Sequence, residues 1–176
     1  MNDNTPVRTG YTNGFQSRSR SVQTVPPAPP AAPAPNNAPK ESLPLAGTRV
    51  LIVDDSEDNQ RIFRFFLEHA GASIEVIGDG SSAVARLLRT DLPRPNLVLM
   101  DIDMPDMDGC EATKRIRAFG IKTPIVALTG HALSGDRTRC LASGCNDHVA
   151  KPVDRTALVR LCGRWGAGHA AASHAA

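Results

Sequence analysis

The chain has 176 residues, and its 20 lysines and arginines against 18 aspartates and glutamates give a formal net charge of +2. This length allows one ordinary domain with an appendage. No apolar run approaches the roughly 18 residues of a membrane-spanning helix. The balanced charge, with a single Trp and a single Tyr, offers no basic surface with stacking aromatic side chains. We therefore expect neither a membrane nor a nucleic acid as a partner.

The first 45 residues differ in composition from the rest of the chain. They hold nine of the 14 prolines, in runs such as PPAPPAAPAP, and show no periodic apolar pattern. Such a composition is typical of a disordered or polyproline-like segment. We predict a disordered Pro/Ala-rich tail at 1–45, one folded domain at 46–165 and a flexible C-terminal end at 166–176. The opening MNDNTPVRTG lacks the charged and then apolar layout of a signal peptide, so a cytoplasmic location is expected.

From Ala46 onward, short apolar runs alternate five times with segments of helical length. The expected strands are 48–53, 73–77, 96–100, 124–128 and 148–150. The expected helices run from an N-cap at Asp58 to Gly71, over 80–89, 110–119 and 133–143, and from a cap at Asp154 toward Trp165. Apolar side chains at helical spacing are expected to face the core, namely Ile62, Phe63, Phe65, Phe66, Leu67, Val84, Leu87, Leu88, Leu158 and Leu161.

This alternation predicts an α/β fold, a doubly wound five-stranded parallel sheet with right-handed crossovers and helices on both faces. A nucleotide-binding half-domain would need GxGxxG after the first strand, and a thioredoxin-like sheet would need CxxC. Neither motif is present. The four cysteines show no zinc-ligand spacing, so we interpret them as buried thiols in a reducing compartment.

Polar residues stand at the ends of the apolar runs. Asp54 and Asp55 follow the first run, Asp101 follows the third, and Thr129 and Lys151 follow the last two. The carboxyl ends of parallel strands meet at one edge of a sheet, so these groups should converge. Clustered carboxylates repel one another unless a cation neutralises them. Mg²⁺ prefers oxygen ligands and is commonly bound by one or two carboxylates together with a phosphate, so the cluster predicts a metal ion and a phosphoryl group at the same site. Each residue alone also fits an ordinary cap, turn or surface role, but their common edge favours a site.

Four segments, VLIVDDSEDN, LVLMDIDMPDMDG, IVALTGHA and HVAKP, together resemble the successive motifs of the response-regulator receiver domain. The chain is most similar to receivers attached to hybrid sensor histidine kinases. The resemblance covers about residues 47–165. It implies the flavodoxin-like strand order 2-1-3-4-5.

The resemblance also implies a metal site. Asp55 and Asp101 would bind Mg²⁺ directly, together with the backbone carbonyl of Asp103. Asp54 would help to hold the ion through water. Magnesium is thus the expected cofactor, and Asp101 is the expected phosphorylation site.

The remaining roles concern the phosphoryl group. The resemblance implies that Asp101 accepts it from a phosphohistidine on a histidine kinase or a histidine phosphotransfer protein. Thr129 would turn toward the phosphoryl group and Lys151 would pair with it, after a cis peptide bond to Pro152. The expected mechanism is positioning and charge neutralisation of an in-line transfer.

Several positions depart from the family's usual pattern. His148 stands where a rotating Tyr or Phe switch residue is common, and it either swings inward as a switch or packs at the edge of a short strand. Gly130 follows the threonine where Ala is usual. Asp103 and His131 flank the path of attacking water in the family, so they are expected to influence the lifetime of the phosphoryl group.

Three functions remain in competition. The first is a stand-alone receiver that signals through its fourth helix, fifth strand and fifth helix, catalyses only its own phosphorylation and dephosphorylation, and binds an unidentified downstream target or forms a transient homodimer. The second is a phosphohydrolase of the haloacid-dehalogenase type, with Asp101 as nucleophile and Asp103 as general acid/base. The third is a binding module that keeps the fold without using phosphate.

Overall fold

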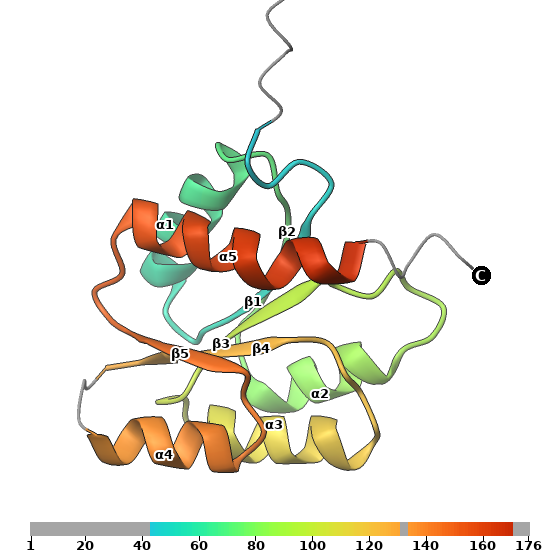
Figure 1. Cartoon of the computed structure of the whole chain (residues 1–176). Coiled ribbons are helices and arrows are strands. Elements are labelled where there is room, and N and C mark those ends of the chain that lie inside the picture. Colours follow the sequence, from blue (N-terminus) through green and yellow to red (C-terminus); the bar gives the residue numbers. More distant parts are fainter. Residues whose placement is uncertain (1–42, 131–133, 171–176) are drawn as a thin grey trace, which may run out of the picture. The chain divides into compact units, whose positions relative to one another are not determined.

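The computed structural model describes residues 43–130 and 134–170 (Figure 1). The predictions for the tail up to residue 42, for His131 and for residues 171–176 lie outside the described residues. The strands are β1 (Arg49–Val53), β2 (Ser73–Ile77), β3 (Leu97–Asp101), β4 (Ile125–Thr129) and β5 (Asp147–Ala150). The helices are α1 (Glu57–Glu68), α2 (Gly80–Leu88), α3 (Gly109–Ala118), α4 (Ser134–Ala142) and α5 (Arg155–Ala170).

The strands form one five-stranded sheet in the order β2-β1-β3-β4-β5, and every neighbouring pair is parallel. The predicted fold class and strand order are therefore confirmed. Val53 pairs with Met100, so Asp54 and Asp101 follow at the same level on adjacent strands. The carboxyl ends of the strands thus meet at one edge of the sheet, as the sequence predicts.

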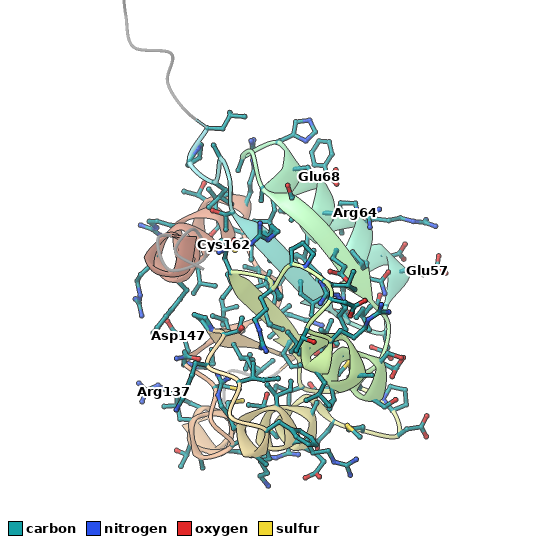
Figure 2. The ribbon with its side chains drawn as sticks, turned by 90° about the vertical axis from the view of Figure 1, so that its right-hand side faces the viewer. Glu57, Arg64, Glu68, Arg137, Asp147 and Cys162 are labelled. Carbon is teal, nitrogen blue, oxygen red and sulfur yellow. The ribbon has the colours of Figure 1, made fainter. Side chains whose placement is uncertain are left out.

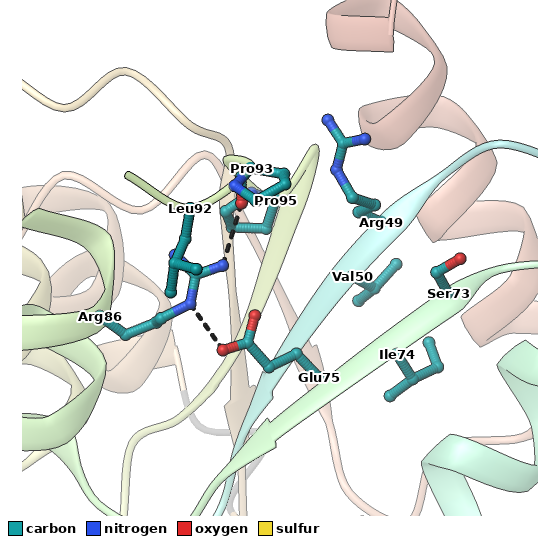
Figure 3. Close-up of a pocket in the computed structure, with 9 residues that line it drawn as sticks. All are labelled: Arg49, Val50, Ser73, Ile74, Glu75, Arg86, Leu92, Pro93 and Pro95. Carbon is teal, nitrogen blue, oxygen red and sulfur yellow. Dashed lines mark hydrogen bonds and ion pairs between the residues drawn. The ribbon is translucent and has the colours of Figure 1, made fainter. Parts of the chain in front are cut away.

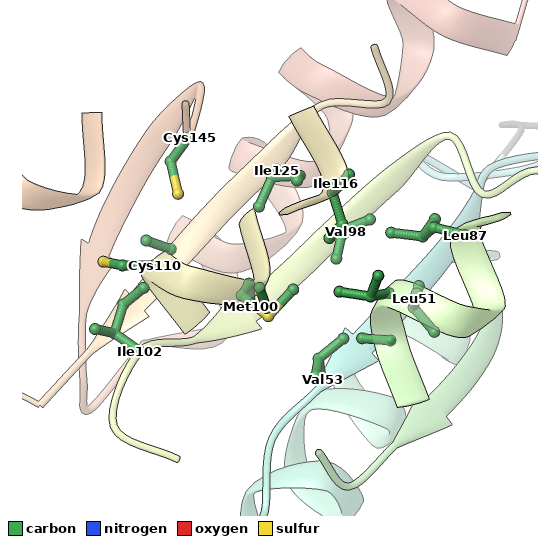
Figure 4. Close-up of a cluster of buried hydrophobic side chains, with 14 of the residues drawn as sticks. Leu51, Val53, Leu87, Val98, Met100, Ile102, Cys110, Ile116, Ile125 and Cys145 are labelled. Carbon is green, nitrogen blue, oxygen red and sulfur yellow. The ribbon is translucent and has the colours of Figure 1, made fainter. Parts of the chain in front are cut away.

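The helices cover both faces of the sheet. Helices α1 and α5 lie on one face, and α2, α3 and α4 lie on the other (Figure 1). Along β1, Val50 and Ile52 pack toward α1 and α5, whereas Leu51 and Val53 pack toward the other three helices (Figure 4). All residues of β3 and β4 are buried because helices cover both faces of these central strands. This is why their sequences are nearly continuous apolar runs.

The start and the buried face of α1 differ from the expectation. Its N-cap is Ser56 and not Asp58, because the Ser56 hydroxyl accepts a hydrogen bond from the Asn59 N–H. Phe63 is buried, but Ile62 and Phe65 are 48% and 55% exposed. The helix turns about 100° per residue, so neighbours of a buried position point away from the core.

The outer face of α1 is charged. Its Glu57, Arg64 and Glu68 side chains point away from the sheet (Figure 2). The Arg64 and Glu68 pair is separated by 4.0 Å and half exposed. Such solvated pairs contribute little to stability.

Other boundaries also shift. Leu45, placed by the sequence in the tail, is only 1% exposed, and its N–H donates to the Ala70 carbonyl at 2.8 Å. At the other end, α5 continues to Ala170, beyond the expected end of the domain. Leu88 is 38% exposed, against the expectation that it faces inward. The cap at Asp154 is confirmed, because its carboxylate accepts main-chain hydrogen bonds from the first turn of α5.

All four cysteines lie in the described part of the chain, where they are buried thiols and form no disulfide bond. Cys110, Cys140 and Cys145 belong to the core beneath α2, α3 and α4, and Cys162 belongs to the core beneath α1 and α5. None of the helices in the described part of the chain is both long and apolar enough to cross a membrane.

Candidate functional site

Three carboxylates gather at the carboxyl edge of the sheet. Asp54 and Asp55 follow β1, and Asp101 is the last residue of β3. One oxygen from each lies within 4.8 Å of the others. Asp54 and Asp101 are buried and Asp55 is exposed, so the cluster is open to solvent on the Asp55 side. The structure thus brings together the carboxylates that the sequence singles out.

Lys151 joins two of these carboxylates. Its Nζ lies 2.7 Å from Asp54 Oδ2 and 2.8 Å from Asp101 Oδ2. The peptide bond between Lys151 and Pro152 is cis, as expected. The Lys151 N–H donates to the Thr129 carbonyl at 2.7 Å, which ties the end of β5 to the end of β4. Thr129 itself is only 2% exposed at this edge.

The first turn of α1 holds Asp54 in place. Asp54 Oδ1 accepts from the Ser56 N–H at 3.0 Å and from Asn59 Nδ2 at 3.1 Å. Gln60 Nε2 donates to the Asp54 carbonyl at 2.6 Å. A buried charge needs such partners to offset the loss of hydration. These roles of Asn59 and Gln60 were not predicted from the sequence, although the amides in SEDNQ lie one helical turn after the acidic pair.

The charges of the cluster oppose one another. Burial raises the pKa of Asp101 above its ordinary value, and the Lys151 ammonium works in the opposite direction without cancelling this. Burial alone would lower the pKa of Lys151, but hydrogen bonds to Asp101 and Asp54 outweigh burial, so this pKa is raised. Three carboxylates and one ammonium leave a net charge of −2, and these hard oxygen ligands suit a divalent cation.

The loop after β3 is packed tightly against Asp101. The Asp103 N–H donates to Asp101 Oδ1 at 3.3 Å, and Asp103 Oδ2 accepts from the Gly130 N–H at 3.2 Å. A Cβ on Gly109 would lie 2.0 Å from the Asp101 carbonyl oxygen. Only glycine therefore allows α3 to begin at this place. This role of Gly109 was not predicted, because nothing in DIDMPDMDG shows how closely the loop returns to its own strand.

His148 lies in β5, opposite Ala127 of β4. Its side chain is 30% exposed, and Nδ1 lies 3.9 Å from Asp147 Oδ1. Within the described part of the chain, Nδ1 is buried without a hydrogen-bond partner. Both interpretations of His148, as a switch and as a packed edge residue, remain compatible with this position.

A hollow of 410 Å³ lies at the opposite end of β1 and β2 (Figure 3). Its wall includes Arg86, which donates to Glu75 Oε1 at 2.6 Å and to the Pro93 carbonyl at 2.9 Å. These contacts tie α2 to the edge strand and to the loop before β3. The guanidinium therefore has a structural role here.

Comparison with known proteins identifies the family. Residues 50–162 match the sequence model of the response regulator receiver domain, which is more than half of the chain. The chain belongs to this family. The receiver fold was therefore assigned correctly from the four sequence motifs.

Relatives of this receiver include both kinases and small proteins. The solved receiver domain of sensor histidine kinase PA1611 from Pseudomonas aeruginosa is 40% identical, with a TM-score of 0.63, over 69% of this chain and 99% of that one, and contains a magnesium ion coordinated in its active-site cleft. An uncharacterized 14.6 kDa protein of Leptolyngbya boryana is 41% identical over 119 residues, which is 66% of this chain and 88% of that protein.

Probable histidine kinase 2 of Oryza sativa is 38% identical over 135 residues. The alignment covers 68% of this chain but only 13% of the kinase. The receiver thus spans a small part of this relative, and the similarity concerns the receiver segment alone.

Proposed function

We propose that this receiver accepts a phosphoryl group on Asp101 from a phosphohistidine of a histidine kinase or a histidine phosphotransfer protein. The observation that supports this most directly is the position of Lys151, whose ammonium lies between Asp54 and Asp101 at 2.7 and 2.8 Å. A fixed cation beside a carboxylate at the sheet edge stabilises the negative charge of a phosphoryl group carried there. Kinases among the relatives support the class of partner.

The reaction transfers one phosphoryl group between two side chains. An Asp101 carboxylate oxygen attacks phosphorus as the bond between phosphorus and the imidazole nitrogen breaks. The electron pair of that bond returns to the nitrogen, and an acyl phosphate remains on Asp101. Lys151 would pair with one phosphoryl oxygen, and the Thr129 hydroxyl would donate to another.

Magnesium fits the carboxylate cluster by its charge and its oxygen ligands. Asp55 and Asp101 would bind the ion directly with the carbonyl of Asp103, and Asp54 would help to hold it. When bound, Mg²⁺ would neutralise charge on the phosphoryl oxygens and the carboxylates. Asp55 is exposed, so this side of the cluster is accessible to a hydrated ion.

Phosphorylation would then be transmitted to the α4–β5–α5 face. Lys151 connects the site to this face, because it follows β5 directly and its N–H is bonded to the end of β4. On this proposal the receiver catalyses only its own phosphorylation and dephosphorylation. Its output is a changed surface for a protein partner.

The test is phosphorylation of the full chain by a small acyl phosphate such as acetyl phosphate, followed by intact-protein mass. One added phosphoryl group is expected in the presence of Mg²⁺ and none with a chelator. Asp101→Asn should remove the modification, whereas Asp106→Asn, in the same loop, should retain it. Modification of Asp101→Asn at the unsubstituted level would contradict the assignment of the phosphoacceptor.

The two competing functions have distinct tests. Asp101 ends the third strand after an acidic pair at the end of the first, whereas the haloacid-dehalogenase motif would end the first strand. We expect no turnover of small phosphomonoesters. A binding module that does not use phosphate would fail to bind beryllofluoride in the presence of Mg²⁺, and we expect this receiver to bind it.

A further inference from the structure

Asp103 contacts both sides of the site. Its N–H donates to Asp101 Oδ1 at 3.3 Å, and its Oδ2 accepts from the Gly130 N–H at 3.2 Å. Gly130 directly follows Thr129, the last residue of β4. The Asp103 carboxylate therefore accepts a hydrogen bond from the first main-chain N–H after β4, that of Gly130.

Glycine at position 130 eases the approach of this carboxylate to the main chain. Gly130 is not among the residues with a positive φ, so its backbone conformation does not require glycine. A Cβ at this position would lie 3.1 Å from Asp103 Oδ2, which is closer than an ordinary contact. The missing side chain leaves room for the carboxylate at the amide.

A phosphoryl group on Asp101 would disturb this contact. The acyl phosphate carries about two negative charges near neutral pH in place of the single charge of the carboxylate, so about one negative charge is added. The Asp103 main chain is bonded to the very carboxylate that would carry the group. Like charges in one site repel, and Asp103 is exposed, so its side chain can turn into water at little cost.

We propose that the Asp103 carboxylate is a built-in competitor that holds the Gly130 amide in the phosphate-free receiver and must be displaced when Asp101 is phosphorylated. Asp103 is thus a positioning residue that weakens the phosphorylated state. This inference rests on the proposed function. It concerns the side chain, separately from the carbonyl of the same residue that would bind Mg²⁺.

The experiment measures beryllofluoride affinity in the presence of Mg²⁺ by calorimetry on the full chain. Asp103→Asn removes the charge and keeps an acceptor for Gly130, so binding should tighten about threefold. Asp103→Ala removes both, so binding should tighten about tenfold. The matched control Asp106→Asn removes one charge from the same loop and should stay within about twofold.

Amide hydrogen exchange at Gly130 provides a second readout that needs no phosphate mimic. Exchange should be about tenfold faster in Asp103→Ala, because the amide loses its acceptor, and should stay near the unsubstituted rate in Asp103→Asn and Asp106→Asn. If Asp103 affected only stability, its replacement by Ala would not combine faster exchange at Gly130 with tighter beryllofluoride binding.

The outcomes are distinguishable. Equal or weaker beryllofluoride binding by Asp103→Ala, or unchanged exchange at Gly130, would overturn the competition while leaving the proposed function intact. No binding by the unsubstituted chain would overturn both. If Asp103→Ala does not fold, Asp103→Asn decides the question, since unchanged affinity in that variant would also overturn the proposal.

Discussion

Replacement of Lys151 by Met would leave two buried carboxylates without their shared cation. At 2.7 Å and an effective dielectric constant of about 20, each contact has a gross Coulomb energy of about 6 kcal/mol, most of which is offset by desolvation. Removing one partner of a buried pair costs about 3 to 5 kcal/mol. Because Asp54 keeps the Ser56 and Asn59 hydrogen bonds, we expect about 3 kcal/mol less free energy of unfolding.

Urea unfolding without Mg²⁺, followed by the fluorescence of the single tryptophan, Trp165, measures this loss. Lys114→Met is the matched control, because Lys114 is exposed on α3 and its replacement should change stability by less than about 0.5 kcal/mol. A loss of less than about 1 kcal/mol in Lys151→Met would refute the reasoning.

The loss should also depend on pH. Burial raises the pKa of Asp101 above the ordinary value of 3.8, and Lys151 limits this rise. A carboxyl group with a raised pKa binds its proton more tightly in the folded state, so stability falls as pH rises from 3.8 to the folded value. Without Lys151 the folded pKa of Asp101 should be higher still, so the pH range over which stability falls becomes wider. The difference between the two proteins should therefore grow as pH rises from 3.8 toward neutral, and a loss that does not change with pH would contradict a charge effect.

Three further substitutions test the packing around the site and the helix ends by urea unfolding. Gly109→Ala places a Cβ 2.0 Å from a carbonyl oxygen and should cost about 3 kcal/mol, whereas Gly163→Ala, with its nearest contact at 3.8 Å, should gain about 0.5 kcal/mol. Asp79→Ala removes the N-cap of α2 and should cost about 1 kcal/mol at neutral pH. Hydrogen bonds from Ser81 and Ser82 lower the Asp79 pKa to about 2, so this contribution is present above pH 3.8 and disappears as pH falls through about 2. Arg117→Met leaves three main-chain carbonyls without their donor and should cost about 3 kcal/mol, whereas loss of the exposed Arg115 in Arg115→Met should cost about 0.5 kcal/mol or less. A smaller loss in Arg117→Met than in Arg115→Met would show that the carbonyls find other donors.

The sequence was sufficient for the sheet and for the convergence of acidic residues. Buried parallel strands appear as continuous apolar runs, and the residue after each run must lie at the carboxyl edge. For this reason the proximity of Asp54, Asp101 and Lys151 could be predicted from the sequence alone. The family motifs supplied the strand order and the roles assigned to these residues.

Contacts that depend on exact geometry could not be predicted from the sequence. Phe63 and Phe65 are the same residue type two positions apart, yet only Phe63 faces the core. The apolar pattern of a helix does not determine its rotation about its axis to the precision of one residue. The role of Gly109 depends on a close return of the main chain to Asp101. Asn59 and Gln60 became recognisable only when the first turn of α1 was seen to fold back on Asp54.

The buried cysteines have a practical consequence for following the motions of this receiver. Burial raises the pKa of Cys162 to about 12 and also raises that of Cys145, so neither thiol is a ready nucleophile in the closed protein. An alkylating reagent would label them only when the surrounding layer opens. Cys162 would report on the layer of α1 and α5, and Cys110, Cys140 and Cys145 on the opposite layer. Labelling followed by peptide mass analysis would therefore show which side of the sheet loosens first.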